Sequence, residues 1–159
     1  DEFPMLSQRS MHYFRRIAEL VLAPVLADDH VHIKRVATSR AASFVKVAVD
    51  TYRSGEDVIA ACKPLLYEFR TYTSRTIALV KYHSELESYI REALAPAPSR
   101  SVRRVDVYRE EHQARVIVEP GTIAQFLGRK GMNAAVASKL TGYGLVLVDE
   151  GDLGKVGGA

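Results

Sequence analysis

Two glycines enclose two cations in the segment Gly128-Arg129-Lys130-Gly131. Glycine has no Cβ atom, so a backbone with glycine at its corners can approach another polymer closely. The amides at the start of a following helix would face the same place, where the helix dipole favours an anion. Because Arg129 and Lys130 add positive charge there, the segment is suited to holding a phosphate group. A basic, solvated turn is the alternative interpretation of these four residues.

The distribution of charge favours an anionic partner. The segment Pro98–Gly142 has eight basic and four acidic residues, a net charge of +4, whereas the whole chain carries +3. The rest of the chain is therefore slightly acidic, and the positive excess lies in the part that holds the two glycines. Such an imbalance is typical of proteins that bind a polyanion.

Hydrophobic periodicity predicts the elements that position the glycine segment. Pro120 suits the first turn of a helix, and Gly142 suits the C-terminal cap of the helix that follows the glycines. The predicted elements are strands at Val102–Tyr108 and Ala114–Val118, helices at Pro120–Leu127 and Met132–Leu140, and a strand at Leu145–Val148.

The first half of the chain predicts the same order of elements. A capping-box pattern at Ser84–Glu87 starts the helix Ser84–Leu94, and Ala95–Pro98 forms a stiff connection after it. The earlier predicted elements are a helix from Ser10 to Val21, strands at Val31–Val36 and Phe44–Val49, short helices from Ser54 and around Leu65–Tyr72, and a strand at Thr76–Tyr82.

Both halves therefore predict the order helix, strand, strand, helix, helix, strand, with an offset of about seventy residues. This repetition predicts an α+β fold of two small domains, each a three-stranded sheet with helices on one face. The expected domains are residues 10–82 and 83–150. A flexible, glycine-rich tail is expected at residues 151–159.

The glycine segment, extended to Phe126–Asn133 and followed by Ala137–Gly142, resembles the last KH domain of the bacterial transcription factor family NusA. Val105–Val107 and Ala114–Val118 fit the first strands of that domain, and Val31–Lys34 with Val45–Val49 fit the preceding KH domain. The resemblance implies two tandem type II KH domains (αββααβ). It also implies that residues 1–9 are a linker from an upstream domain absent from this sequence.

The resemblance further implies that the second domain binds single-stranded RNA, the nascent transcript, during elongation, termination or antitermination of transcription. RNA polymerase would be a partner through the full-length factor. The implied RNA-binding residues lie in and around the glycine segment and are Gly128, Arg129, Lys130, Gly131, Ile123, Leu127, Asn133 and Lys139.

The first domain departs from the family pattern. Its corresponding segment, Ala60–Leu66, contains no glycine, and Pro64 has no amide proton to donate to a phosphate. The first domain has therefore either lost RNA binding or contacts RNA only through Lys63, Arg70 and Arg75. An alternative function for the chain is a protein-interaction platform that docks a polymerase or ribosomal partner, with RNA binding secondary.

Enzymatic, metal and membrane functions are not expected. The single cysteine, Cys62, lies in an apolar run and is interpreted as a buried small residue. Because no histidine is spaced with Cys62 for a zinc site and no catalytic set is present, we expect no cofactor and no metal. A weak divalent-ion site at His30 and His32 is a minor alternative. One cysteine and no apolar run of membrane-spanning length suit a cytoplasmic protein.

Tyrosines are the remaining candidates for contact with nucleic acid. Tyr67, Tyr72 and Tyr82 could stack on bases, because every base has an aromatic face. Tyrosine at the ends of strands and helices, however, more often packs half-buried with its hydroxyl toward water.

Overall fold

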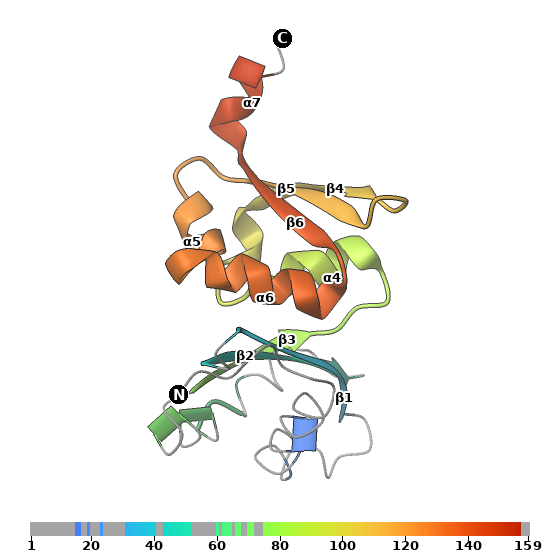
Figure 1. The fold of residues 1–159 in the computed structure, drawn as a ribbon, viewed down its shortest axis with the longest axis vertical. Coiled ribbons are helices and arrows are strands. Elements are labelled where there is room, and N and C mark those ends of the chain that lie inside the picture. The colour runs from blue at the N-terminus through green and yellow to red at the C-terminus, as the bar shows by residue number, and fades with distance from the viewer. Residues whose placement is uncertain are drawn as a thin grey trace. The chain divides into compact units, whose positions relative to one another are not determined.

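The computed structural model describes residues 15–16, 19, 23, 31–40, 43–51, 60, 62–64, 66–67, 70–71 and 75–156. The chain divides into two compact units, Asp1–His83 (unit 1) and Ser84–Ala159 (unit 2). Each unit contains a three-stranded sheet (Figure 1). The predicted α+β class with two such sheets is confirmed. The predicted linker 1–9 and the helix start at Ser54 lie outside the described residues, as does most of the helix Ser10–Val21.

The sheet of unit 1 is formed by β1 (Val31–Thr38), β2 (Phe44–Thr51) and β3 (Thr76–Lys81), in that order. Strand β2 is central, antiparallel to β1 and parallel to β3. Val45, Val47 and Val49, which share one face of β2, are buried, and so are Lys46 and Ala48 on its other face. Residues 62–64, 66–67 and 70–71, in the segment before β3, are helical.

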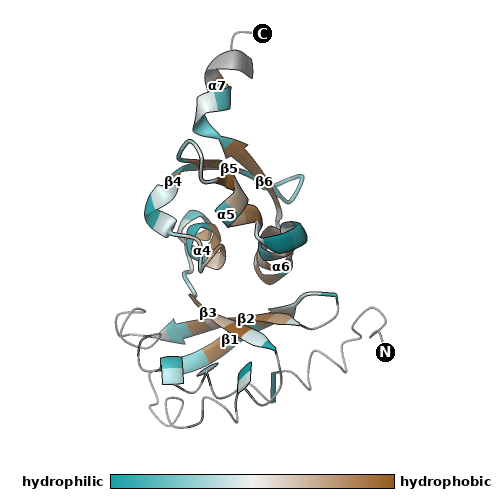
Figure 2. Ribbon diagram, turned by 90° about the vertical axis from the view of Figure 1, so that its left-hand side faces the viewer, coloured by the Kyte–Doolittle hydropathy of each residue, from teal (hydrophilic) through white to brown (hydrophobic). Residues whose placement is uncertain are grey.

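Unit 2 repeats this topology. Its sheet has the order β4 (Val102–Tyr108), β5 (Gln113–Val118), β6 (Gly144–Asp149), with β4 antiparallel and β6 parallel to β5. Helices α4 (Leu86–Ala93), α5 (Ile123–Leu127) and α6 (Met132–Thr141) lie against one face of this sheet (Figure 1). Strands β5 and β6 are strongly hydrophobic in Figure 2, which fits their place over the core.

Helix α6 forms where the sequence predicts it. Its buried face includes Val136, Ala137 and Leu140, which helical spacing places together. Gly142 follows in the left-handed conformation, with φ of 79°, and its N–H donates to the carbonyl of Ser138 at 2.9 Å. The predicted glycine cap is therefore confirmed, since a side chain at this φ would be strained.

Two predicted helix starts are wrong by a few residues. Helix α4 begins at Leu86 with Glu85 as its N-cap and without a side-chain cap, because Glu85 instead accepts from the hydroxyl of Ser88 at 2.8 Å. Helix α5 begins at Ile123, not at Pro120. The residues before it form a turn in which the amide and hydroxyl of Thr122 donate to the carbonyl of Glu119, at 3.2 and 2.6 Å.

The predicted flexible tail is helical over most of its length. Helix α7 (Glu150–Val156) extends from the end of β6 (Figure 1). A carboxylate oxygen of Asp149 accepts from the N–H of Gly151 in the first turn at 2.7 Å, which is the bond that an N-cap makes. Acidic residues in that turn complement the helix dipole. Residues 157–159 lie outside the described residues. Among the described residues, no helix is long and apolar enough to span a bilayer.

Candidate nucleic-acid interface

The glycine segment forms the corner between α5 and α6. Gly128 ends α5 with φ of 73° and ψ of 179°, and Gly131 precedes α6 with φ of 72°. The N–H of Gly128 donates to the carbonyl of Ala124, and that of Gly131 donates to the carbonyl of Gly128, both at 3.0 Å. These bonds close a short turn over Arg129–Gly131. Lys130 itself has a positive φ of 55°. Three of the four residues from Gly128 to Gly131 are thus held at a positive φ, which glycine favours.

Glycine is required at positions 128 and 131 for different structural reasons. A Cβ atom on Gly128 would lie 2.6 Å from the Cβ atom of Asn133 and 3.0 Å from its backbone nitrogen, so the turn packs directly on the first residues of α6. A Cβ atom on Gly131 would meet nothing within 4 Å. Gly128 is therefore required by both packing and backbone conformation, and Gly131 by conformation alone.

Asn133 holds the corner together from inside. It is 5% exposed, and its amide nitrogen donates to the carbonyls of Leu94 at 2.9 Å and Phe126 at 2.8 Å. These bonds tie the first turn of α6 to the residues that end α4 and to α5. Asn133, which the sequence analysis assigned to RNA binding, is thus a buried amide whose nitrogen donates to two backbone carbonyls, an arrangement that positions the corner.

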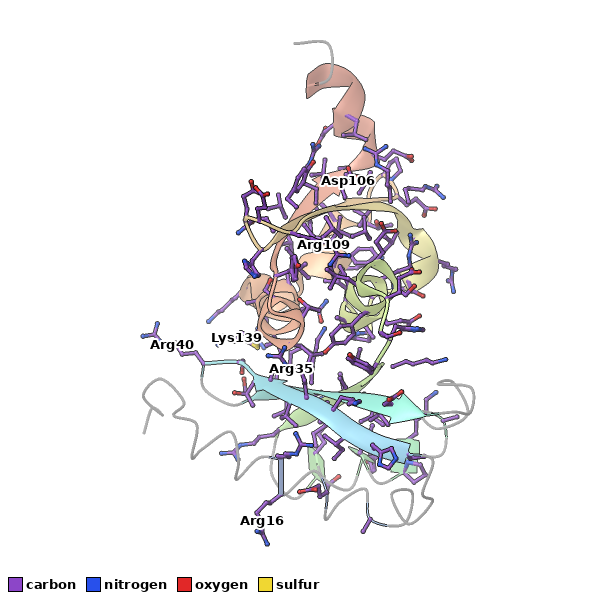
Figure 3. All side chains as sticks on the ribbon, turned by 90° about the vertical axis from the view of Figure 1, so that its right-hand side faces the viewer. Arg16, Arg35, Arg40, Asp106, Arg109 and Lys139 are labelled. Carbon is purple, nitrogen blue, oxygen red and sulfur yellow. The ribbon has the colours of Figure 1, made fainter. Side chains whose placement is uncertain are left out.

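The two cations of the segment point outward. Arg129 and Lys130 are exposed, whereas Phe126 is fully buried and anchors α5. Lys139 is also exposed but lies in the last turn of α6, about 12 Å along the helix axis from Gly131. Figure 3 shows Lys139 in the helix layer of unit 2. The structure thus brings Arg129 and Lys130 together and leaves Lys139 at the other end of α6.

An apolar strip lies beside the glycine corner. Leu127 is 40% exposed and Ile123 is half-buried, both on α5, which packs beside β6. On β6, Leu145 and Leu147 pair with Ala114 and Val116, two fully buried residues of β5, and are themselves half-buried on the same face.

Comparisons with known proteins agree with this geometry. Residues 86–155 match the family model of the NusA-like second KH domain. The match spans nearly all of unit 2, which is therefore similar to the second KH domain of NusA-like proteins.

Relatives named "Transcription termination/antitermination protein NusA" match nearly the whole chain. The protein of Halalkalibacterium halodurans is 28% identical over 158 residues, 96% of this chain and 40% of its own length. The Mycobacterium tuberculosis protein is 29% identical over 143 residues, 87% of this chain and 40% of its own length. The Bacillus subtilis protein is 27% identical over 151 residues, covering 90% and 38%. The chain thus resembles the KH-domain region of NusA and spans two-fifths or less of these relatives.

A solved structure supports the fold. The crystal structure of APE1850 aligns with a TM-score of 0.58 and 16% sequence identity, over 90% of this chain and 100% of that chain. At this identity the likeness concerns the fold alone.

Unit 1 has no corner like that of the NusA-like domain among its described residues. Where a glycine turn was sought, residues 62–64 are helical. Cys62 is buried, as predicted, and burial raises the pKa of its thiol, which disfavours a reactive thiolate. No cluster of metal-ligating side chains occurs in the part of the chain that the structure describes.

Proposed function

We propose that the NusA-like KH domain of unit 2 binds single-stranded RNA at the Gly128–Gly131 corner, within a factor that acts in transcription termination and antitermination. The observation that carries the proposal is the pair of exposed cations, Arg129 and Lys130, held on a tight glycine turn at the start of α6. The names of the relatives support a role in transcription termination and antitermination. On this proposal the RNA is the nascent transcript, and RNA polymerase is a partner of the longer factor.

The chemistry of binding divides between the corner and the apolar strip. The amides of Gly128 and Gly131 donate within the turn, so the phosphate contacts fall to the amides and side chains of Arg129 and Lys130. The dipole of α6 adds a favourable potential for phosphate at the same place. The strip formed by α5 and β6 then receives about four unstacked bases, the number that a KH domain holds.

A salt-titrated binding measurement tests the proposal. A fluorescently labelled single-stranded oligoribonucleotide is titrated with the chain and with the double variant Arg129→Ala, Lys130→Ala. Both side chains are exposed, so the variant keeps the fold. Loss of two phosphate contacts should weaken binding and flatten the slope of log affinity against log salt by roughly 1.4. The matched control is Arg100→Ala with Arg109→Ala, which removes the same charge from exposed positions at either side of β4.

The control should lose much less affinity than the corner variant. Equal losses in the two variants would show that only net charge matters. Unchanged affinity and slope in the corner variant would identify the corner as a basic, solvated turn. In that case the protein-interaction platform becomes the better account of the chain.

A further inference from the structure

Unit 1 carries an unusually exposed aromatic side chain. Tyr67 is 73% exposed, more than any other large hydrophobic residue in the described part of the chain. The sequence analysis favoured half-buried packing for this tyrosine, and the structure shows the opposite. Its backbone carbonyl accepts from the hydroxyl of Thr71 at 3.0 Å, four residues on, which agrees with a helical segment here.

Two exposed cations share the helix face of Tyr67. Lys63 precedes it by four residues and Arg70 follows it by three, and all three residues are helical and exposed. Residues at this spacing lie above one another on one side of a helix. At the rise of an α-helix, the seven residues from Lys63 to Arg70 correspond to about 10 Å along the axis. From Ala60 to Arg75 the sequence contains three basic residues and one acidic residue, so the segment is basic overall.

We infer that Lys63, Tyr67 and Arg70 form a second contact for single-stranded RNA, in which a base stacks on Tyr67 and the cations meet the phosphates on either side. The inference rests on the proposed function of unit 2. It assigns unit 1 a different mode of binding, because a helix face replaces the glycine corner. Exposed aromatics between cations are what sequence-tolerant binding of a single strand requires, and stacking needs no shaped pocket.

Charge complementarity favours a nucleic acid over a protein as the partner of this helix face. A protein-docking helix face is commonly an apolar stripe at this spacing. Here the stripe has one aromatic ring with a cation at each end, and Pro64 beside it is also exposed. A bound single strand would cover the Tyr67 ring with a base and place phosphates near Lys63 and Arg70. Each group of the stripe would then have a partner.

The test compares two lengths of oligoadenylate binding to the whole chain. A short probe of about 4 nucleotides fills one KH groove. A long probe of about 16 nucleotides can also reach a second site. Tyr67→Ala should lower the affinity for the long probe by about fivefold or more, which is the loss expected for one stacked base. The affinity for the short probe should not change. Tyr67→Phe keeps the ring and should bind like the wild type. Tyr108→Ala, which removes the 43% exposed tyrosine of β4, is the matched control and should have no effect.

The cations give a second measurement. Lys63→Ala with Arg70→Ala should flatten the salt slope of the long probe by roughly 1.4. Wild-type affinity of Tyr67→Ala for the long probe, or an equal loss for both probes, would overturn the inference. The corner variant Arg129→Ala, Lys130→Ala reports separately on unit 2, because it should weaken both probes. If that variant binds both probes like the wild type, the proposed function fails, whatever the outcome at Tyr67.

Discussion

The two units share a sheet topology, but the third residue of the central strand has different surroundings in each unit. Lys46 is the third residue of β2, and Arg115 is the third residue of β5. Arg115 is half-exposed and stands opposite Asp106 on β4. Lys46 is 0% exposed and stands between Ala37 and Ala78. One sheet therefore keeps its cation beside a carboxylate and water, and the other buries it between two alanines of the neighbouring strands.

This difference extends to further positions on the same face of each sheet, although Ile117 on that face of unit 2 is also buried. In unit 2 that face carries exposed Tyr108 and Val146, whereas in unit 1 it carries buried Ala37, Ala48 and Val80. The ammonium group of Lys46 lies 5.5 Å from the ring centroid of Phe44, an arrangement that offsets part of the cost of burial. Burial nevertheless lowers the pKa of Lys46 from 10.5 to about 7. A repeated topology thus does not imply repeated electrostatics.

The largest expected effect is on the pH dependence of the free energy of unfolding, and it follows from Lys46. Between pH 7 and 10.5 the unfolded chain binds a proton at this lysine that the folded chain has released. The free energy of unfolding should therefore rise with pH across this range, by on the order of 5 kcal/mol in total. The cost of the buried charge is fully present below pH 7 and absent above 10.5. Urea denaturation at a series of pH values measures the rise.

Substitution at the two equivalent positions sharpens this comparison. Lys46→Met should stabilise the chain near pH 7 and remove most of the rise with pH. Arg115→Met should leave the rise in place, because its guanidinium stays charged in both states. Identical pH profiles for the wild type and Lys46→Met would show that Lys46 remains charged in the folded chain.

Substitution of the two glycines at the corner of unit 2 should have the next largest effect on the free energy of unfolding. Gly128→Ala should cost about 3 kcal/mol, because the new Cβ atom meets Asn133 and the backbone is held where an L-residue is strained. Gly131→Ala should cost about 1 kcal/mol, since only its left-handed conformation opposes the change. Urea denaturation of the two variants measures the difference. Equal costs would mean that the close packing of Gly128 on α6 relaxes freely.

The smallest expected effect on stability comes from the residues at the end of the third strand of each sheet, β3 and β6. β3 ends at Lys81 and is followed by non-helical residues, whereas β6 ends at Asp149 and is followed directly by α7. Asp149 also accepts from the N–H of Gly121 at 3.1 Å, in addition to capping α7. Asp149→Ala should therefore cost about 1 kcal/mol and reduce helical circular dichroism. Retention of full helicity would show that α7 depends instead on the contact of Glu150 with Arg103, at 3.2 Å.

Much of the fold follows from patterns local in the sequence. Strand β4 covers the predicted Val102–Tyr108 without change, and the other strands differ from prediction by one or two residues at their ends. Helix α6 and its Gly142 cap were also predictable. Alternating apolar residues, β-branched runs and a glycine after a helical stripe act through neighbours in the chain, so they are visible without the fold.

The glycine corner was predictable for the same local reason, but its supports were not. The burial of Asn133 depends on Leu94, 39 residues away in sequence, and the helix cap at Asp149 also binds an amide 28 residues away. The exposure of Tyr67 and the burial of Lys46 likewise depend on what the fold places over each side chain. The sequence by itself determined the repeated elements and the basic glycine turn, because these depend on backbone preference and periodicity. Only the tertiary structure decided which polar and aromatic side chains face water, because that depends on contacts between residues far apart in the chain.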